Sequence, residues 1–300
     1  MYTRILVTLD GSQLSECILP YARSFAKAFN IPVELLEVIE PDTLMPSVVA
    51  QHGRYHDVMT AEREKRSAYL KEVATLFSGS LAVDCNVKIG KPAEIIVDTA
   101  AAHAGTLIAM ATHGRSGVKR WLLGSVADKV LHAAANHLLL VRTTERTQGS
   151  ERALLERVMA PLDGSGLAES VIPHAVELAR KMNLEIVLLR AYTLPTPVYA
   201  DEGYAPDLGE LWEQIRKESQ QYLDEMARKL RGEGLDRVST VVLEGNAAEK
   251  IIDLAHKSPK SLVAMSTHGR TGVGRWVLGS VTDRVVRHSD DPVLVIRASS

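Results

Sequence analysis

Short apolar runs alternate with longer amphipathic stretches along the whole chain. In the first half, runs rich in Val, Ile and Leu predict strands at residues 4–9, 33–39, 81–89, 106–110 and 137–142. Runs of this length are typical of buried parallel strands, and the stretches between them carry apolar residues at helical spacing. Strands and helices in alternation predict a parallel sheet with helices on both of its faces.

The same order of elements returns in the second half of the chain. The strands predicted there cover residues 157–162, 185–191, 237–244, 261–265 and 292–297. Asp10 and Asp163 follow the first strand of each half, and Gly124 and Gly279 precede the last helix. The two glycines are further apart than the two aspartates by two residues, so the repeat contains a short insertion.

Length and repeat together set the domain organisation that we expect. A chain of 300 residues exceeds one average domain of about 150 residues. The polar segment 143–151 contains no large apolar residue and is the predicted linker. We therefore expect an α/β protein of two tandem doubly wound, Rossmann-like domains, residues 1–146 and 152–300. Each domain would hold a five-stranded parallel sheet flanked by helices.

Two irregular, proline-containing segments interrupt the regular pattern. They cover residues 40–56 and 192–209, and each precedes a long helix with a charged face, predicted at about 57–77 and 209–231. The irregular segments are long and differ between the halves, which is typical of lids and of surfaces that contact a partner.

Composition excludes several other classes of protein. The chain is 46% apolar and 24% charged with a net charge of −2, which excludes general disorder and gives no basic excess for nucleic acid. No apolar run approaches the length of about 20 residues that crosses a membrane, and the first residues do not resemble a secretory signal. The two cysteines, Cys17 and Cys85, both lie in the first half and do not suggest a structural disulfide. These features favour a cytoplasmic protein without membrane contact.

A glycine-rich segment recurs almost unchanged in both halves. Residues 111–130 are ATHGRSGVKRWLLGSVADKV, and residues 266–285 are STHGRTGVGRWVLGSVTDRV. Each copy follows a predicted strand and leads into a predicted helix. A strand that opens into such a loop and then a helix can hold phosphate, because backbone N–H groups approach the anion and the helix dipole favours negative charge. We therefore expect a nucleotide site in each half.

The spacing inside this segment resembles a known family. The copies have the form Ala111-x2-Gly114-x9-Gly124-Ser125 and Ser266-x2-Gly269-x9-Gly279-Ser280. This resembles the Gly-x2-Gly-x9-Gly-(Ser/Thr) motif of the ATP-binding universal stress proteins. The resemblance spans nearly the whole chain twice, including the Asp after the first strand and the Gly-Lys-Pro-Ala-Glu helix start.

The resemblance implies a set of binding residues in each half. The aspartates that follow the first strand would lie near adenine and ribose, or near a metal on the phosphates: Asp10 and Asp163. Residues at the end of the second strand would border the adenine, and methionines of the fourth strand would pack beside it: Val38, Ala191, Met110 and Met265. The loop and the first residues of the following helix would surround ribose and phosphates: Ala111, Gly114, Gly124, Ser125, Val126, Ser266, Gly269, Gly279, Ser280 and Val281. The implied cofactor is ATP, alone or with Mg²⁺.

Other interpretations of these residues stay open at the level of sequence. Asp10 and Asp163 equally suit a turn before a helix, because Asp-Gly-Ser is ordinary turn chemistry. Gly124 and Gly279 equally suit close packing between a strand and a helix.

The chain departs from the family motif at its first glycine. Ala111 and Ser266 stand at that position, and a Cβ there narrows the space between backbone and ligand. A positive φ at either residue would also be strained. We expect this departure to weaken nucleotide binding without abolishing it.

No group of residues predicts catalysis or a protein-bound metal. His113 and His268 lie in the glycine-rich loops without a paired nucleophile, and His52 and His56 lack a third ligand. The chain has no G-x-x-x-x-G-K-(S/T) phosphate loop and no Ser/His/Asp arrangement. We name no catalytic and no metal-binding residues.

The resemblance implies an ATP-binding protein of the stress response that acts through nucleotide-dependent conformation or through an unidentified protein partner. Two alternatives remain: a slow Mg²⁺-dependent ATPase or self-phosphorylating enzyme, and a nucleotide-free dimeric scaffold. The last strand of each half, at 137–142 and 292–297, is apolar and needs a cover. In the resembled family such strands pair two domains, so we expect pairing within this chain and homodimerisation as a further option.

Overall fold

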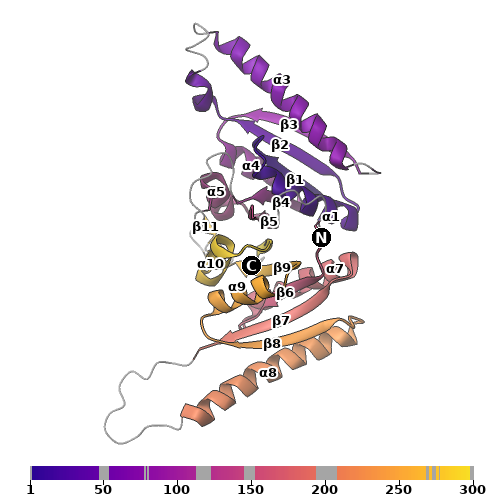
Figure 1. The fold of residues 1–300 in the computed structure, drawn as a ribbon, viewed down its shortest axis with the longest axis vertical. Helices are drawn as coiled ribbons and strands as arrows, with labels where there is room; N and C mark the ends of the chain where they lie inside the picture. Colours follow the sequence, from indigo (N-terminus) through magenta and orange to yellow (C-terminus); the bar gives the residue numbers. More distant parts are fainter. Residues whose placement is uncertain are drawn as a thin grey trace, which may run out of the picture. The chain divides into compact units, whose positions relative to one another are not determined.

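The computed structural model describes residues 2–46, 54–77, 79, 81–112, 123–144, 153–193, 208–267, 270–271, 275–276 and 278–297. Two compact units result, one containing Met1–Ala153 and the other containing Leu154–His268 and Leu278–Ser299 (Figure 1). Both are α/β, as predicted. The predicted linker lies mostly outside the described residues.

In the first unit, five parallel strands follow the order β3-β2-β1-β4-β5. They are β1 (Arg4–Leu9), β2 (Val33–Ile39), β3 (Val83–Ile89), β4 (Thr106–Ala111) and β5 (Leu138–Val141). The helical elements are η1 (Ser15–Ile18), α1 (Leu19–Phe29), η2 (Pro41–Leu44), α3 (Tyr55–Ala74), η3 (Thr75–Phe77), α4 (Pro92–Ala101) and α5 (Ser125–Ala133). The strand order reverses between β1 and β4, which is where a doubly wound sheet leaves a crevice at the carboxyl ends of its strands.

The second unit repeats this plan with the order β12-β9-β6-β7-β8. Its strands are β6 (Arg157–Pro161), β7 (Glu185–Tyr192), β8 (Val238–Glu244), β9 (Ser261–Thr267) and β12 (Val293–Arg297). Its helices are α6 (Gly166–Glu169), α7 (Ile172–Met182), α8 (Leu208–Gly232), α9 (Ala247–Lys257) and α10 (Ser280–His288). A short antiparallel pair that the sequence does not predict, β10 (Arg270–Thr271) and β11 (Arg275–Trp276), follows β9 in the sequence and is grouped with the first unit.

The apolar runs become strands because both of their faces are covered. Ile5, Leu6 and Val7 of β1 are fully buried, as are Leu107 and Ile108 of β4. By contrast, side chains of the outer strand β3 are only half-buried or exposed, which agrees with its more polar sequence. Of the helices in the described ranges, none combines the length and the apolar character that crossing a bilayer requires.

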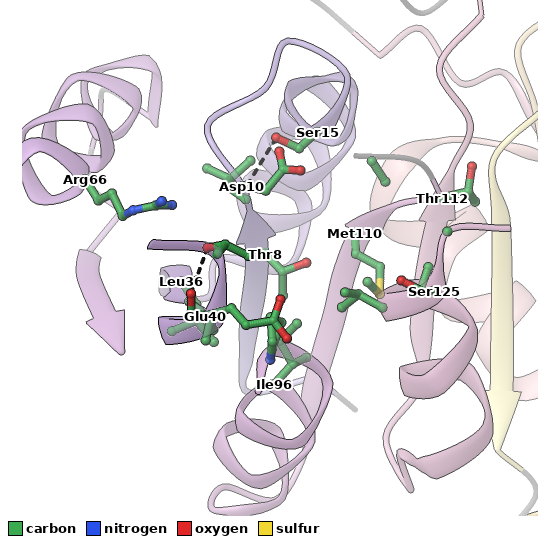
Figure 2. A pocket seen from close by; sticks show the side chains of 18 residues that line it. Thr8, Asp10, Ser15, Leu36, Glu40, Arg66, Ile96, Met110, Thr112 and Ser125 are labelled. Atoms are coloured by element: carbon green, nitrogen blue, oxygen red, sulfur yellow. Dashed lines mark hydrogen bonds between the residues drawn. The ribbon is translucent and has the colours of Figure 1, made fainter. Parts of the chain in front are cut away.

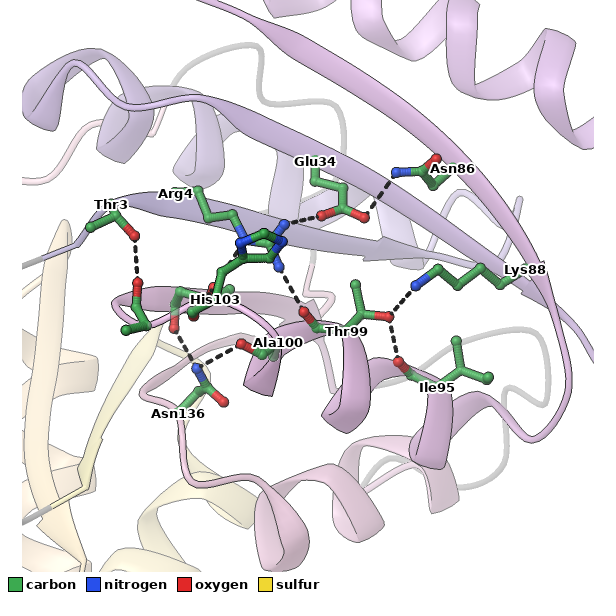
Figure 3. Close-up of polar contacts among 12 residues, drawn as sticks. Thr3, Arg4, Glu34, Asn86, Lys88, Ile95, Thr99, Ala100, His103 and Asn136 are labelled. Atoms are coloured by element: carbon green, nitrogen blue, oxygen red, sulfur yellow. Dashed lines mark hydrogen bonds and ion pairs between the residues drawn. The ribbon is translucent and has the colours of Figure 1, made fainter.

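A polar network ties α4 to the sheet of the first unit (Figure 3). Arg4 donates from Nη1 to Glu34 and from Nη2 to the backbone oxygen of Thr99, at 2.6 Å. Asn86 donates to the other oxygen of Glu34 at 2.9 Å, and Lys88 donates to Thr99 Oγ1 at 2.8 Å. These contacts join β1, β2 and β3 to the second half of α4, and they fix the position of that helix over the sheet.

Helices α1 and α7 end in the same way. Asn30 and Asn183 adopt left-handed backbone conformations, with φ of 52° and 54°. The following residues, Ile31 and Leu184, are buried and donate backbone hydrogen bonds back to Ala26 and Ala179, at 3.1 and 3.0 Å. This six-residue closure satisfies carbonyls that the helix end would otherwise leave without a partner.

This geometry predicts how the two caps respond to substitution. A left-handed conformation costs an ordinary L-residue about 1–2 kcal/mol, and Asn and Gly tolerate it best. Asn30→Ala and Asn183→Ala should each lower the free energy of unfolding by about 1 kcal/mol, whereas Asn30→Gly and Asn183→Gly should not. Urea denaturation followed by circular dichroism measures the difference. Equal midpoints for the Ala and Gly variants would contradict the assignment.

Candidate functional site

A cavity of about 360 Å³ opens at the carboxyl ends of β1, β2 and β4 in the first unit (Figure 2). Every predicted site residue of this half that the structure describes lines it: Asp10, Val38, Met110, Ala111, Gly124, Ser125 and Val126. Gly114 lies outside the described residues. The structure therefore brings together residues that stand far apart in the sequence.

A second cavity of about 350 Å³ occupies the equivalent place in the second unit. Its lining includes all the described residues that we predicted for this half: Asp163, Ala191, Met265, Ser266, Gly279, Ser280 and Val281. Gly269 is outside the described residues, as are His113 and His268. The repeat in the sequence is thus also a repeat of the cavity.

Several lining residues were not predicted from the sequence. In the first unit they include Leu36 on β2 and Pro92 and Ile96 on α4. Their counterparts Leu189, Ala247 and Ile251 line the second cavity. The sequence does contain a signal for Pro92 and Ile96 of α4. The helix start after Gly90 recurs after Gly245 with the same spacing. From the sequence alone, that repeat indicates only a helix start.

The aspartates that follow the first strands hold tight turns. Asp10 Oδ1 accepts hydrogen bonds from Ser12 N at 3.0 Å and Ser12 Oγ at 2.6 Å. Asp163 Oδ1 accepts the same pair from Ser165, at 2.9 and 2.6 Å. The glycines between them have φ of 77° and 90°, which explains why glycine stands there. Both carboxylates thus make the turn contacts of the simpler interpretation and also line a cavity.

The electrostatic surroundings keep Asp163 ionised. Partial burial opposes its charge, but hydrogen bonds from the Ser165 side chain and backbone and the positive charge of Arg190 outweigh it, so the pKa of Asp163 lies below its usual 3.8. The second cavity therefore presents a carboxylate anion at neutral pH. An anion of this kind accepts hydrogen bonds from hydroxyl groups or binds a cation.

A helix N-terminus lines each cavity. Gly124 and Gly279 are the N-cap residues of α5 and α10, with φ of −59° and −63°. These negative angles suit any residue, so glycine is not required by the backbone there. It leaves open the space in front of the first helical N–H groups, where an anion is favoured.

The strain that we considered at Ala111 and Ser266 does not arise. Both residues belong to strands, β4 and β9, and neither has a positive φ. The departure from the family motif therefore adds a Cβ to the cavity wall without distorting the backbone. Gly124 N donates to Thr112 O at 2.8 Å, which closes the base of the loop in the first unit.

The charged groups beside the two cavities differ. In the first unit Glu37 forms a buried ion pair with Arg66 of α3. In the second unit Arg190 occupies the position of Glu37, and its Cζ lies 5.0 Å from the centre of the Tyr222 ring. The tyrosines Tyr69 and Tyr222 correspond to each other, and each donates to a glutamate, at 2.9 and 2.8 Å. Burial and these glutamates raise the pKa of both phenols, so the phenols stay protonated and donate to the glutamates at neutral pH.

The arrangement provides for a ligand with a flat apolar part and an anionic part. In the first unit, Leu36, Val38 and Met110 offer an apolar wall, and α5 offers its N-terminus. Within the described ranges, no group of three or more His, Cys, Asp or Glu side chains is arranged to hold a metal ion.

Comparison with known proteins finds the same repeat along the chain. The model of the universal stress protein family matches residues 1–142 and again 155–297. A universal stress protein of Mycolicibacterium smegmatis is 25% identical over 301 residues, covering 98% of this chain and 96% of that protein. One of Methanocaldococcus jannaschii is 30% identical over 145 residues, covering 48% of this chain and 83% of its own length.

A solved structure shares the complete fold. The universal stress protein from Archaeoglobus fulgidus superposes with a TM-score of 0.72 at 20% identity, over 100% of both chains. With the family model matched twice, the chain belongs to the universal stress protein family and carries two of its domains in tandem.

Proposed function

We propose that each unit binds ATP or a related adenine nucleotide at its cavity, and that the protein acts in the stress response through nucleotide-dependent conformation or partner binding. One observation carries this proposal. In both units an apolar wall, a carboxylate and a helix N-terminus surround a single cavity at the point where the strand order reverses.

The roles of the residues follow from their places in the cavity. Val38 and Met110 would enclose the adenine in the first unit, as would Ala191 and Met265 in the second. Asp10 and Asp163 would accept hydrogen bonds from the ribose hydroxyls or hold Mg²⁺ brought by the phosphates. Backbone N–H groups at Ser125, Val126, Ser280 and Val281 would bind the phosphates, because they belong to the first turns of α5 and α10.

The direct test is the nucleotide content of the protein. Purified protein is denatured, its supernatant is analysed for adenine nucleotides, and ATP is titrated into a nucleotide-free sample by calorimetry. Adenine nucleotide release or calorimetric binding supports the proposal. If neither occurs, the nucleotide-free scaffold takes its place. Product analysis in the same samples, with and without Mg²⁺, decides whether bound ATP is hydrolysed.

Substituting the N-cap glycines should remove binding without disturbing the fold. Their backbone angles accept a branched residue, so Gly124→Val and Gly279→Val should place a side chain in front of the helix N-terminus without strain. Each variant should lose one ATP site by calorimetry, and the double variant should lose both, with circular dichroism unchanged. Retained stoichiometry would place the ligand elsewhere.

The two aspartates distinguish a binding role from a turn role. Asp10→Asn and Asp163→Asn keep the Oδ1 acceptor that holds the turn but remove the negative charge. If the carboxylate contacts the nucleotide, ATP affinity at the corresponding site should fall about tenfold, the effect of weakening one charge-assisted hydrogen bond. Exposed Asp236→Asn serves as a matched control. Unchanged affinity in both variants would leave the aspartates with the turn role alone.

A further inference from the structure

Arg66 is a buried cation at the wall of the first cavity. It lies in the middle of α3, its side chain is only 9% exposed, and it lines the cavity together with residues of β1 and β2 (Figure 2). A guanidinium group stays charged in proteins, so its burial requires partners. Two glutamates supply them. Nη1 donates to Glu37 on β2, and Nε donates to Glu62 one helical turn earlier, at 3.3 Å.

These partners determine what the guanidinium can offer to a ligand. Glu37 is 1% exposed, so the ion pair is desolvated and holds the planar group in one orientation. Nη1 and Nε are engaged, and no described residue accepts a hydrogen bond from Nη2. The third nitrogen of a rigid donor group is therefore available at the cavity wall.

The place of Arg66 relative to the order of the strands indicates which part of the ligand this side chain can reach. Arg66 lines the cavity near the end of β2 from the face of the strand that carries Glu37, and Leu36 and Val38 line it from the opposite face of the same strand. The anion-binding end lies across the cavity, beyond β1 and β4, at the N-terminus of α5. Arg66 therefore stands at the end of the cavity assigned to the base. Glu40 supplies a carboxylate acceptor at the same end.

The second unit lacks this donor. Tyr69 and Tyr222 are equivalent, so Ser219 stands where α3 has Arg66, and it is buried. Glu37 is replaced by Arg190, which stacks on Tyr222. The residues described as lining the second cavity include no Lys, Arg or His. The two sites thus share an apolar wall and a helix N-terminus but differ at the end where the base would lie.

From this difference we infer that Arg66 is a specificity-determining residue of the first site, where it donates a hydrogen bond from Nη2 to an acceptor nitrogen of the purine ring. Glu40 is placed to accept from the exocyclic amine, so that the pair matches an edge that carries one acceptor and one donor. The residues described as lining the second site include no counterpart of Arg66, so that site lacks this hydrogen bond and is less selective. This inference rests on the proposed nucleotide function of the cavity.

The test compares ATP with analogues that each lack one ring nitrogen: 1-deaza-ATP, 3-deaza-ATP and 7-deaza-ATP. Gly279→Val isolates the first site, and Gly124→Val isolates the second. In the first site either 1-deaza-ATP or 7-deaza-ATP should bind about tenfold more weakly than ATP, because N1 and N7 are the ring acceptors next to the exocyclic amine and one charge-assisted hydrogen bond is lost. 3-deaza-ATP should bind about as well as ATP, and a loss confined to this analogue would contradict the pairing with Arg66 and Glu40. In the second site all three should bind about as well as ATP.

Variants at position 66 test whether the discrimination between ATP and the sensitive analogue depends on the arginine. Arg66→Lys keeps the charge beside Glu37 but removes the planar donor group. The double variant Glu37→Arg/Arg66→Ser transplants the residues of the second unit and leaves no buried glutamate without a partner. Both should bind the sensitive analogue and ATP with similar affinity. Arg63→Lys, an exposed arginine on the same helix, is the matched control and should keep the discrimination.

Each result has a defined meaning. Equal binding of ATP and all three analogues to the first site overturns the role of Arg66, as does discrimination that survives in Arg66→Lys and in the double variant. Absence of ATP binding to both isolated sites and to the unmodified protein overturns the proposed function itself, and this inference with it. Circular dichroism and thermal unfolding of every variant exclude loss of the fold as the cause.

Discussion

The reversal of strand order beside β1 is the constraint on which both sites depend. Crossover connections in a parallel sheet are right-handed, so the helices that follow β1 and β2 cover one face and those that follow β3 and β4 cover the other. At the reversal, neighbouring strands send their chains to opposite faces, and no helix can fill the space between them. The cavity is thus a consequence of topology. The side chains only decide what it accepts.

The same topology leaves some positions free to differ between the repeats. The aspartate turns, the N-cap glycines and the strand-four methionines are the same in both units, and all of them line the cavities. Glu37 and Arg190, by contrast, stand on the face of β2 and β7 that meets a long helix. There the requirement is only that a buried charge finds a partner, which Arg66 satisfies for Glu37 and the Tyr222 ring satisfies in part for Arg190.

Much of the fold and of the two sites could be predicted from the sequence, because short local patterns indicate the strands and the turns. The strand ends predicted from the sequence lie within about two residues of the strand ends in the structure. The turn at Asp10 is predicted by its Asp-Gly-Ser sequence. Arg66 could not be found in this way. On a charged helix one buried arginine has the same local pattern as its exposed neighbours, and its partner Glu37 lies on a strand whose contacts depend on the tertiary fold. The extended backbone of Ala111 is not predicted by the sequence for a related reason, because strand β4 continues one residue beyond the predicted strand end at Met110.

This last point changes how the missing motif glycine bears on the site. With Ala111 and Ser266 inside strands, the position of the missing motif glycine lies at the carboxyl end of a parallel ladder: Ala111 pairs with Val141 at the last rung, and Ser266 pairs with Ile296 one rung before the last. A side chain at such a rung points to one defined face and cannot move away from a ligand. Methyl and hydroxymethyl groups are small enough to leave a cavity of about 350 Å³ in each unit. The two substituents differ in one respect that matters for recognition, because Ser266 adds a hydroxyl to the wall of the cavity that lacks the arginine.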